Sequence, residues 1–277
     1  MALEPLIPYL SVPELKLIPK GVFGGFPPAD ISIKPFGTLV AIGVYLGAWL
    51  AVRQGKRLGL EERRLVSFIF WVVVTGFLLG HVLDVLLYYP GRLRDDPLSL
   101  VRVWDGLSSF GGFTGALTGT LLFKWRHKVK VLPYADVVSS AFPVGWVFGR
   151  AGCSLAHDHP GIYSDAWFAV QYPGGARFDL GLYEMLLTIP LAVSFLLLRG
   201  RPRPWGFYIG TMCVAYAPTR FALDFLRARD TREADARYAA LTPAQWLCFL
   251  LLAFGVAMLW YALSQQSKQP ASVEATP

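Results

Sequence analysis

The chain has 277 residues, of which 54% are hydrophobic and 16% are charged, with a mean hydropathy of +0.44. Soluble domains usually carry about 25% charged residues, so this composition excludes an ordinary soluble domain and favours a membrane protein. In such a protein the net charge of +7 indicates basic loops beside anionic lipid headgroups and not binding to nucleic acid. The three widely spaced cysteines exclude a disulfide framework and a CxxC metal motif.

Residues 1–26 lack the basic start, apolar stretch and small-residue cleavage site of a secretory signal peptide. We therefore expect the first apolar segment to act as the insertion signal. A helix needs roughly 20 mostly apolar residues to cross a bilayer. Seven segments meet this requirement, in chain order 36–52, 65–88, 107–125, 134–156, 180–198, 205–225 and 242–264. The sequence predicts an all-α integral membrane protein with seven transmembrane helices.

Basic residues in the short loops predict the orientation, because loops rich in lysine and arginine stay on the cytoplasmic side. The basic loops follow the first, third and fifth segments and contain Arg53, Lys56, Arg57, Arg63 and Arg64, then Lys124, Arg126, Lys128 and Lys130, then Arg199, Arg201 and Arg203. The N-terminus is therefore predicted outside and the C-terminus in the cytoplasm. We expect residues 1–264 to form a single membrane domain and the polar residues 265–277 a disordered cytoplasmic tail.

The first polar group within a predicted span is Arg150, flanked by Gly149 and Gly152 near the outer end of the fourth segment. An ionisable residue at membrane depth is costly and indicates function or a buried partner. A guanidinium suits a phosphate or carboxylate ligand, and small neighbours let a headgroup approach the backbone. The alternative is a structural ion pair with Asp84 or Glu184. The nearby Cys153 is either a reactive thiol or, more simply, a small core residue.

The sequence His157-Asp158-His159-Pro160-Gly161 follows the fourth segment directly. The histidines and the acid could supply a general base, or ligands for a metal, although no further cluster with ligand spacing is evident. A polar turn that ends the helix is the alternative, because proline and glycine are common stop signals.

Two further groups stand near the same predicted face. Tyr183 and Glu184 begin the fifth segment, where they could contact a ligand, or Glu184 could neutralise a buried arginine. Arg220, Asp224 and Arg227 have the spacing of one helical face, and a pair of arginines held by a carboxylate suits phosphate. The alternative is a charge cluster that reaches out to water. Arginines from different helices at one face predict a cavity for a phospholipid headgroup.

These motifs, in this order, resemble the bacterial phosphatidylglycerol–prolipoprotein diacylglyceryl transferase family over about residues 31–263. The resemblance depends on Gly-Arg-Ala-Gly at 149–152, Trp-Asp-Gly at 104–106, Gly-Gly-Phe-Thr-Gly at 111–115, Leu-Tyr-Glu at 182–184, Arg220 with Asp224 and Arg227, and Leu241-Thr242 with Gln245. It implies an enzyme that moves a diacylglyceryl group from phosphatidylglycerol to the lipobox cysteine thiol of a prolipoprotein, with glycerol phosphate as the leaving group.

By this resemblance Arg150 would hold the lipid phosphate and offset developing negative charge, and Arg220 would act on the same headgroup. With the residue analysis, it predicts the catalytic residues Arg150, Arg220, Asp158 and His157. The predicted substrate-binding residues are Gly111, Gly112, Cys153, Gly161, Tyr183, Glu184, Asp224 and Arg227. No cofactor and no metal is expected. The expected partners are phosphatidylglycerol, the prolipoprotein signal peptide and the bacterial inner membrane, which the chain would cross several times.

The chain departs from the family pattern at two positions that bear on proton transfer. Phe110 stands where the family usually has a histidine before the double glycine, and Phe36 stands where it has a tyrosine. The proton of the acceptor thiol would then pass to His157, His159, Asp158 or solvent at the membrane, or the thiol would ionise unaided beside the arginines. The alternative function is a divergent relative that binds phospholipid without this catalysis or uses another acceptor. A small-solute transporter is disfavoured, because the polar residues cluster near one face and no internal repeat is visible.

Overall fold

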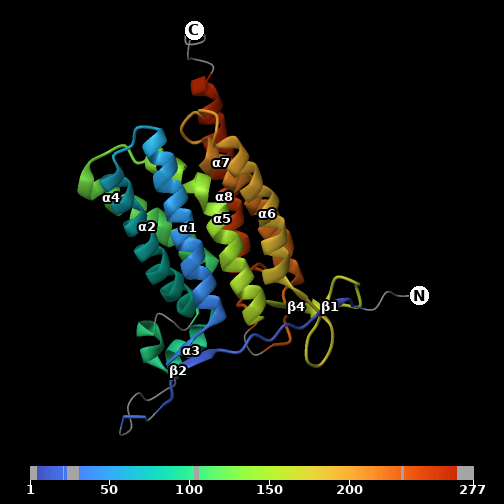
Figure 1. Cartoon of the computed structure of the whole chain (residues 1–277). Helices are drawn as coiled ribbons and strands as arrows, with labels where there is room; N and C mark the ends of the chain where they lie inside the picture. Colours follow the sequence, from blue (N-terminus) through green and yellow to red (C-terminus); the bar gives the residue numbers. More distant parts are fainter. Residues whose placement is uncertain (1–4, 21, 24–30, 103–105, 232–233, 267–277) are drawn as a thin grey trace.

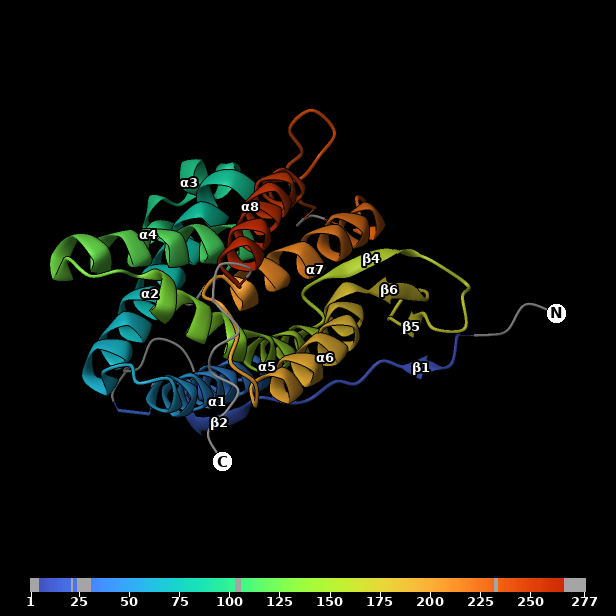
Figure 2. The same ribbon diagram turned by 90° about the horizontal axis from the view of Figure 1, so that it is seen from above.

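The computed structural model describes residues 5–20, 22–23, 31–102, 106–231 and 234–266. Within these residues seven long helices form a bundle, and the short strands gather at one end of it (Figures 1 and 2). The long helices are α1 (Pro35–Arg57), α2 (Glu62–Leu83), α4 (Ser109–His127), α5 (Leu132–Ala156), α6 (Leu180–Leu198), α7 (Phe207–Leu223) and α8 (Pro243–Gln266). Each coincides with one predicted apolar segment to within a few residues. Trp104, Asp105 and residues 267–277 of the predicted tail lie outside the described residues.

Four of the described helices are long and apolar enough to cross a membrane, namely α1, α2 with its extension to Tyr88, α6 and α8. The membrane class predicted from composition is thereby supported, while the count of seven spans and the orientation stay predictions. The extension of α2 is a π-helical turn, Asp84–Tyr88. Of the other three, α7 has only 17 residues, α4 is rich in glycine and threonine, and α5 contains the charged residues Asp136 and Arg150.

The outer surface of the bundle is apolar. On α4, Leu117 is 60% exposed, and on α8, Leu250 is 67% exposed. Scattered exposed apolar residues are normal in soluble proteins, but large continuous apolar surfaces are not. Large apolar side chains are exposed on α1, α2, α4, α6 and α8, including Tyr45, Phe70, Leu121, Leu197 and Trp260. Lipid is the medium that suits this surface.

Glycines bring two pairs of helices into close contact. A Cβ atom on Gly43 of α1 would lie 2.6 Å from the carbonyl oxygen of Gly145 on α5, and the reverse substitution is equally crowded. A Cβ atom on Gly115 of α4 would lie within 2.3 Å of the Thr75 carbonyl oxygen on α2. Small residues at such crossings allow close packing of backbones in membranes. The Thr75 hydroxyl adds a hydrogen bond to the Gly115 carbonyl oxygen, at 2.7 Å.

Two small sheets, which the all-α prediction did not anticipate, lie at one end of the bundle (Figure 1). The four-stranded sheet has the order β1 (Ile7–Pro8), β5 (Val170–Gln171), β6 (Arg177–Asp179), β4 (Pro160–Tyr163), with β1 parallel to β5. The second sheet pairs β2 (Leu15–Ile18) with β3 (Ile31–Ile33). The same end contains the short helix α3 (Pro90–Asp95) and a 3-10 turn, Pro97–Val101.

Candidate functional site

The carboxylate of Glu184 joins two buried arginines at the sheet-bearing end of the bundle. Glu184 lies near the start of α6, Arg150 near the end of α5 and Arg220 near the end of α7. Arg150 Nε lies 2.9 Å from Glu184 Oε1, and Arg220 Nε lies 3.8 Å from Oε2. All three residues are at most 5% exposed. Three helices therefore bring two positive charges and one negative charge together below the protein surface, which requires good geometry to offset desolvation.

Asp224 extends this network toward the surface. Its Oδ1 accepts a 2.5 Å hydrogen bond from Arg220 Nη1 and lies 3.2 Å from Arg227 Nε, while its Oδ2 accepts from the hydroxyl of Thr242. Arg227 also forms an ion pair with Asp235. We call Arg150, Glu184, Arg220, Asp224, Arg227 and Asp235 the arginine–carboxylate network. Positive and negative residues alternate along the network, from α5 to the segment that precedes α8.

The proximity of Arg220, Asp224 and Arg227 was predicted, but not the backbone that produces it. Helix α7 ends at Leu223, a 3-10 turn covers Asp224–Leu226, and Arg227 is extended with φ −64° and ψ 139°. The interpretation of one continuous helical face was therefore wrong at its last position. Asp224 still contacts both arginines because the 3-10 turn keeps Arg227 beside it.

The ion-pair alternative for Arg150 is the arrangement seen, with Glu184 and not Asp84 as its partner. Arg150 also lies over the ring of Trp146, 4.6 Å from the centroid, which is a cation–π contact. Among the described residues, the polar contacts of Arg150 use Nε and Nη1. Its Nη2 atom is left to donate to a ligand. A Cβ atom on Gly149 would meet nothing within 4 Å, so the space at that position of α5 is open.

Three residues that belong to the network or contact it were not predicted from the sequence. Tyr216 donates a 2.5 Å hydrogen bond and Trp146 a 3.1 Å hydrogen bond to Glu184 Oε1. Each precedes an arginine of the network by one helical turn, and that spacing could have indicated them. The third, Asp235, lies in a loop, where the sequence carries no such periodic signal.

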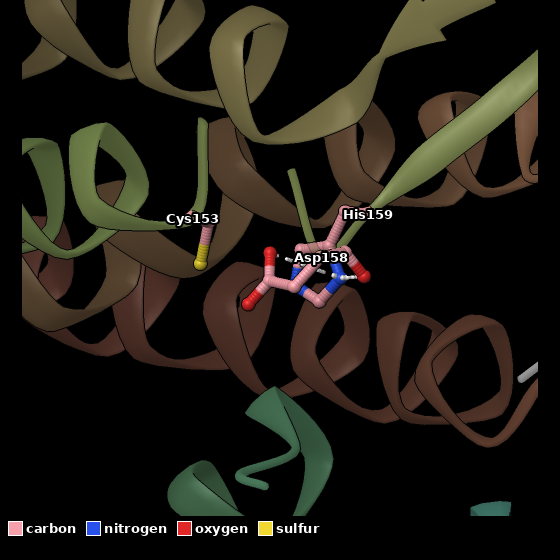
Figure 3. Close-up of side chains that lie close together, drawn as sticks. All are labelled: Cys153, Asp158 and His159. Carbon is pink, nitrogen blue, oxygen red and sulfur yellow. Dashed lines mark hydrogen bonds and ion pairs between the residues drawn. The ribbon is translucent and has the colours of Figure 1, made fainter. Parts of the chain in front are cut away.

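Cys153, Asp158 and His159 lie together beside this network (Figure 3). Their potential ligand atoms all lie within 4.8 Å of one another, a grouping that the sequence analysis did not find. Two guanidiniums border the group: Arg150 Nη1 lies 3.8 Å from Cys153 Sγ, and Arg227 Nη2 lies 3.0 Å from His159 Nδ1. These positive charges oppose a cation and favour an anionic ligand or a developing negative charge.

The ionisation of Asp158 and His159 follows from their surroundings. Partial burial raises the pKa of Asp158 to about 6, despite the opposing effect of Arg150 and Arg227. Burial and the nearby arginines lower the pKa of His159 well below its usual range. Near neutral pH the Asp158 carboxylate is thus mostly ionised. Its pKa is also close to the ambient pH, which suits a general base.

His157 has a different environment from its neighbours. It ends α5 in the left-handed conformation, with φ 50°. Its Nδ1 lies 2.8 Å from Asp179 Oδ2, its Nε2 lies 3.1 Å from the carbonyl oxygen of Leu10, and its ring stacks on Tyr9 at 3.9 Å between centroids. Both ring nitrogens therefore have an oxygen neighbour, one from the four-stranded sheet and one from the N-terminal segment. His157 thereby connects the N-terminal segment to the four-stranded sheet.

Other predicted substrate-binding residues are packed against neighbouring elements. Tyr183 donates a 2.7 Å hydrogen bond to the Phe168 carbonyl oxygen, away from the arginines. A Cβ atom on Gly161 would lie 2.8 Å from the Leu226 carbonyl oxygen, and one on Gly111 would lie 2.3 Å from the Leu79 carbonyl oxygen. These two glycines allow close backbone contact. Gly112, by contrast, has open space around its Cβ position.

An apolar helical bundle with a buried network of arginines and carboxylates at one end defines a membrane protein with a site for an anionic group. The family model of prolipoprotein diacylglyceryl transferase matches residues 26–261. The chain therefore belongs to the prolipoprotein diacylglyceryl transferase family, as its motifs predicted.

Similar proteins include three that bear the name phosphatidylglycerol–prolipoprotein diacylglyceryl transferase. The protein from Chromohalobacter salexigens is 31% identical over 86% of this chain and 93% of its own length. The protein from Pseudomonas paraeruginosa is 29% identical over 88% of this chain and 96% of its own. The protein from Pseudoalteromonas translucida is 28% identical over 89% of this chain and 94% of its own. The similarity thus extends over nearly the full length of these relatives.

Proposed function

We propose that this chain transfers a diacylglyceryl group from phosphatidylglycerol to the lipobox cysteine thiol of a prolipoprotein. The observation that carries the proposal is the pair of buried guanidiniums, Arg150 and Arg220, held by the one carboxylate of Glu184. The carboxylate fixes both guanidiniums before any ligand arrives. Their remaining N–H groups are then oriented toward a phosphate without further ordering cost, which is the basis of electrostatic stabilisation in enzymes.

In the proposed reaction the acceptor sulfur attacks the glyceryl carbon that carries the phosphate ester. A C–S bond forms, the C–O bond to the phosphate breaks, and glycerol phosphate leaves with the bonding electron pair. Arg150 and Arg220 offset the negative charge on the leaving phosphate. The thiol proton passes to Asp158, whose carboxylate lies beside Cys153 and His159 at the network. A catalytic role for His157 has less support, because both of its ring nitrogens already contact other groups, at Asp179 and Leu10.

The proposal places the chain in the bacterial inner membrane with seven spans, the N-terminus outside and the C-terminus in the cytoplasm. The arginine–carboxylate network then faces the outer leaflet, where a prolipoprotein signal peptide presents its cysteine. In support, the basic loops at 53–64, 124–130 and 199–203 all connect helices at the end opposite the sheets. Cys153, Gly112, Asp224 and Arg227 would line the headgroup site.

Complementation tests the proposal most directly. A bacterial cell depleted of its own diacylglyceryl transferase is supplied with this chain, and lipidation of a lipobox precursor is measured by its shift in mass. We expect the precursor to gain a diacylglyceryl group. Absence of lipidation, with the protein expressed and inserted, would contradict the transferase function and leave phospholipid binding without this catalysis as the alternative.

The same assay tests the role of Arg150. Arg150→Ala removes a buried charged contact, which costs about 2–5 kcal/mol, or roughly 30- to several-thousand-fold in rate. Arg126→Ala, which removes an exposed arginine at the far end of α4, is the matched control and should transfer at the wild-type rate. Near wild-type transfer by Arg150→Ala would refute the phosphate role.

A further inference from the structure

A second polar pocket lies at the opposite end of the bundle, between α1, α5 and the start of α7. It is lined by Gln54, Asp136, Ser140, Arg203, Trp205 and Tyr208, among others. Fourteen residues of α5 separate Asp136 from Arg150, a distance of about 21 Å along the helix axis. The pocket is therefore independent of the arginine–carboxylate network and of the proposed transfer reaction.

Buried polar atoms in this pocket have no hydrogen-bond partner among the described residues. They include Oε1 of Gln54, the hydroxyl of Tyr208 and Nε of Arg203. Gln54 and Tyr208 are only 5% and 4% exposed. Buried polar atoms in folded proteins nearly always have a partner, so these atoms indicate a missing one. The cavity volume is about 10 Å³, which admits one water-sized group such as a single oxygen atom.

Arginines outnumber carboxylates around the pocket, because Asp136 is the one acid among its lining residues, against Arg201 and Arg203. None of these arginines, nor Arg199, whose charge acts on Tyr208, has an ion pair with a carboxylate in the part of the chain that the structure describes. Burial lowers the pKa of Arg199, and so do the charges of Arg57 and Arg53. Oδ1 of Asp136 accepts a 3.0 Å hydrogen bond from the backbone N–H of Ile209, so this carboxylate caps the start of α7.

The setting of the pocket favours a lipid as the source of a compensating anion. Trp205 lines the pocket, and Arg53 lies over the ring of Trp49, 5.4 Å from its centroid. Tryptophan is enriched where a membrane protein meets the headgroups, and basic pockets between helices bind anionic lipid headgroups. Leu58, Arg201 and Arg203 of the pocket lining belong to two of the predicted basic loops.

We propose that this pocket binds the phosphate group of an anionic phospholipid from the leaflet at this end of the bundle. One phosphate oxygen enters the cavity and accepts from Arg203 Nε and the Tyr208 hydroxyl. Gln54 Oε1 accepts from a hydroxyl or a water molecule that accompanies the headgroup. The remaining phosphate oxygens stay at the surface beside the other arginines.

Thermal unfolding of the full-length protein in a neutral detergent tests this site. Phosphatidic acid, phosphatidylcholine or inorganic phosphate is added at equal phosphate concentration, and the shift in Tm is recorded. We expect phosphatidic acid to raise the Tm of the wild-type protein more than either of the others. In Arg203→Gln the Tm increase caused by phosphatidic acid should fall to less than half of the wild-type increase. In Arg126→Gln, at the same end but outside the pocket, the increase should be unchanged.

Tyr208→Phe keeps the ring contacts with Phe195 and Phe207 and removes only the hydroxyl, so it separates a folding defect from a binding defect. This variant should fold, and phosphatidic acid should raise its Tm less than it raises the Tm of the wild-type protein. An unchanged gain in both Arg203→Gln and Tyr208→Phe would overturn the site. An equal gain from inorganic phosphate would overturn the lipid as its ligand and assign the pocket to free phosphate.

Discussion

Arg150 Nε and Glu184 Oε1 lie 2.9 Å apart, and both side chains are almost completely buried. The same carboxylate also serves Arg220, so its loss would leave two guanidiniums without their shared counter-charge. This arrangement makes Glu184 the residue on which the geometry of the candidate site depends.

Glu184→Gln should therefore destabilise the protein as well as abolish transfer. Removal of one partner from a buried ion pair costs about 3–5 kcal/mol, because the remaining charge is uncompensated. Thermal unfolding in detergent measures the loss. Glu61→Gln is the matched control: Glu61 pairs with Arg64 at 2.7 Å, but both side chains are about half exposed, and such pairs contribute about 0–1 kcal/mol. Equal Tm values for the two variants would contradict the central role of Glu184.

Transfer should depend on pH through Asp158. Its pKa is raised to about 6, so the basic carboxylate form grows as the pH rises through 6, and the rate of transfer should increase over that range. The raised pKa also means that the folded protein binds this proton more tightly than the unfolded chain. The contribution of Asp158 to stability therefore increases as the pH falls from about 6 toward 4.

Asp158→Asn should lose most of the transfer activity, and its remaining rate should no longer increase as the pH rises through 6, the acidic limb of the pH–rate profile. Transfer rates between pH 5 and 8 measure both effects. Asp165→Asn changes an exposed acid in the loop that follows β4 and should leave the profile intact. A profile with the same limb near pH 6 in Asp158→Asn would assign the proton to another group.

The contacts of His157 predict that it attaches the N-terminal segment to the bundle. Its Nδ1 contacts Asp179 and its Nε2 contacts the Leu10 carbonyl oxygen, with Tyr9 and Tyr172 packed against the ring. His157→Gln removes the ring and these contacts, so amide hydrogen exchange in residues 6–10 should become faster. His127→Gln, at the far end of α4, is the control and should leave exchange in residues 6–10 unchanged.

The crossing of α1 and α5 should not tolerate a methyl group. Gly145→Ala would place Cβ 2.7 Å from the Gly43 carbonyl oxygen, and overpacking of this kind costs about 1–3 kcal/mol. Gly37→Ala has nothing within 4 Å of the new methyl group and serves as the control. The comparison needs only thermal unfolding of both variants; a Gly145→Ala protein as stable as Gly37→Ala would show that the helices can separate freely.

The sequence was most informative about the helices and least informative about the connections between distant segments. Each long helix coincides with an apolar run, because a span of roughly 20 apolar residues is a strong local signal. The partner of Arg150 could be reduced to Asp84 or Glu184, since few acids lie at membrane depth. The choice between them depends on how α5 and α6 pack, which no local sequence pattern predicts.

The sheets and the contacts of His157 were not predictable for a similar reason. Strands β1 and β5 have two residues each, too short for an alternating pattern. The stacking of Tyr9 on His157 joins segments that are remote in the chain, and the local sequence around neither residue predicts the contact. The grouping of Cys153 with Asp158 and His159 depends on the left-handed turn at His157, which reverses the chain at the end of α5.

The pairing of Ile7 with Val170 in strands β1 and β5 also constrains the route of the chain through a bilayer. Hydrogen-bonded strands must lie on one side, so the chain between them crosses an even number of times. Helices α1, α2, α4 and α5 lie between the two strands and supply four such passages when all of them cross. During synthesis β1 is made first, and its partner strand is made only after those four helices. The sheet therefore forms late in assembly, once the long interval between its two strands has been synthesised.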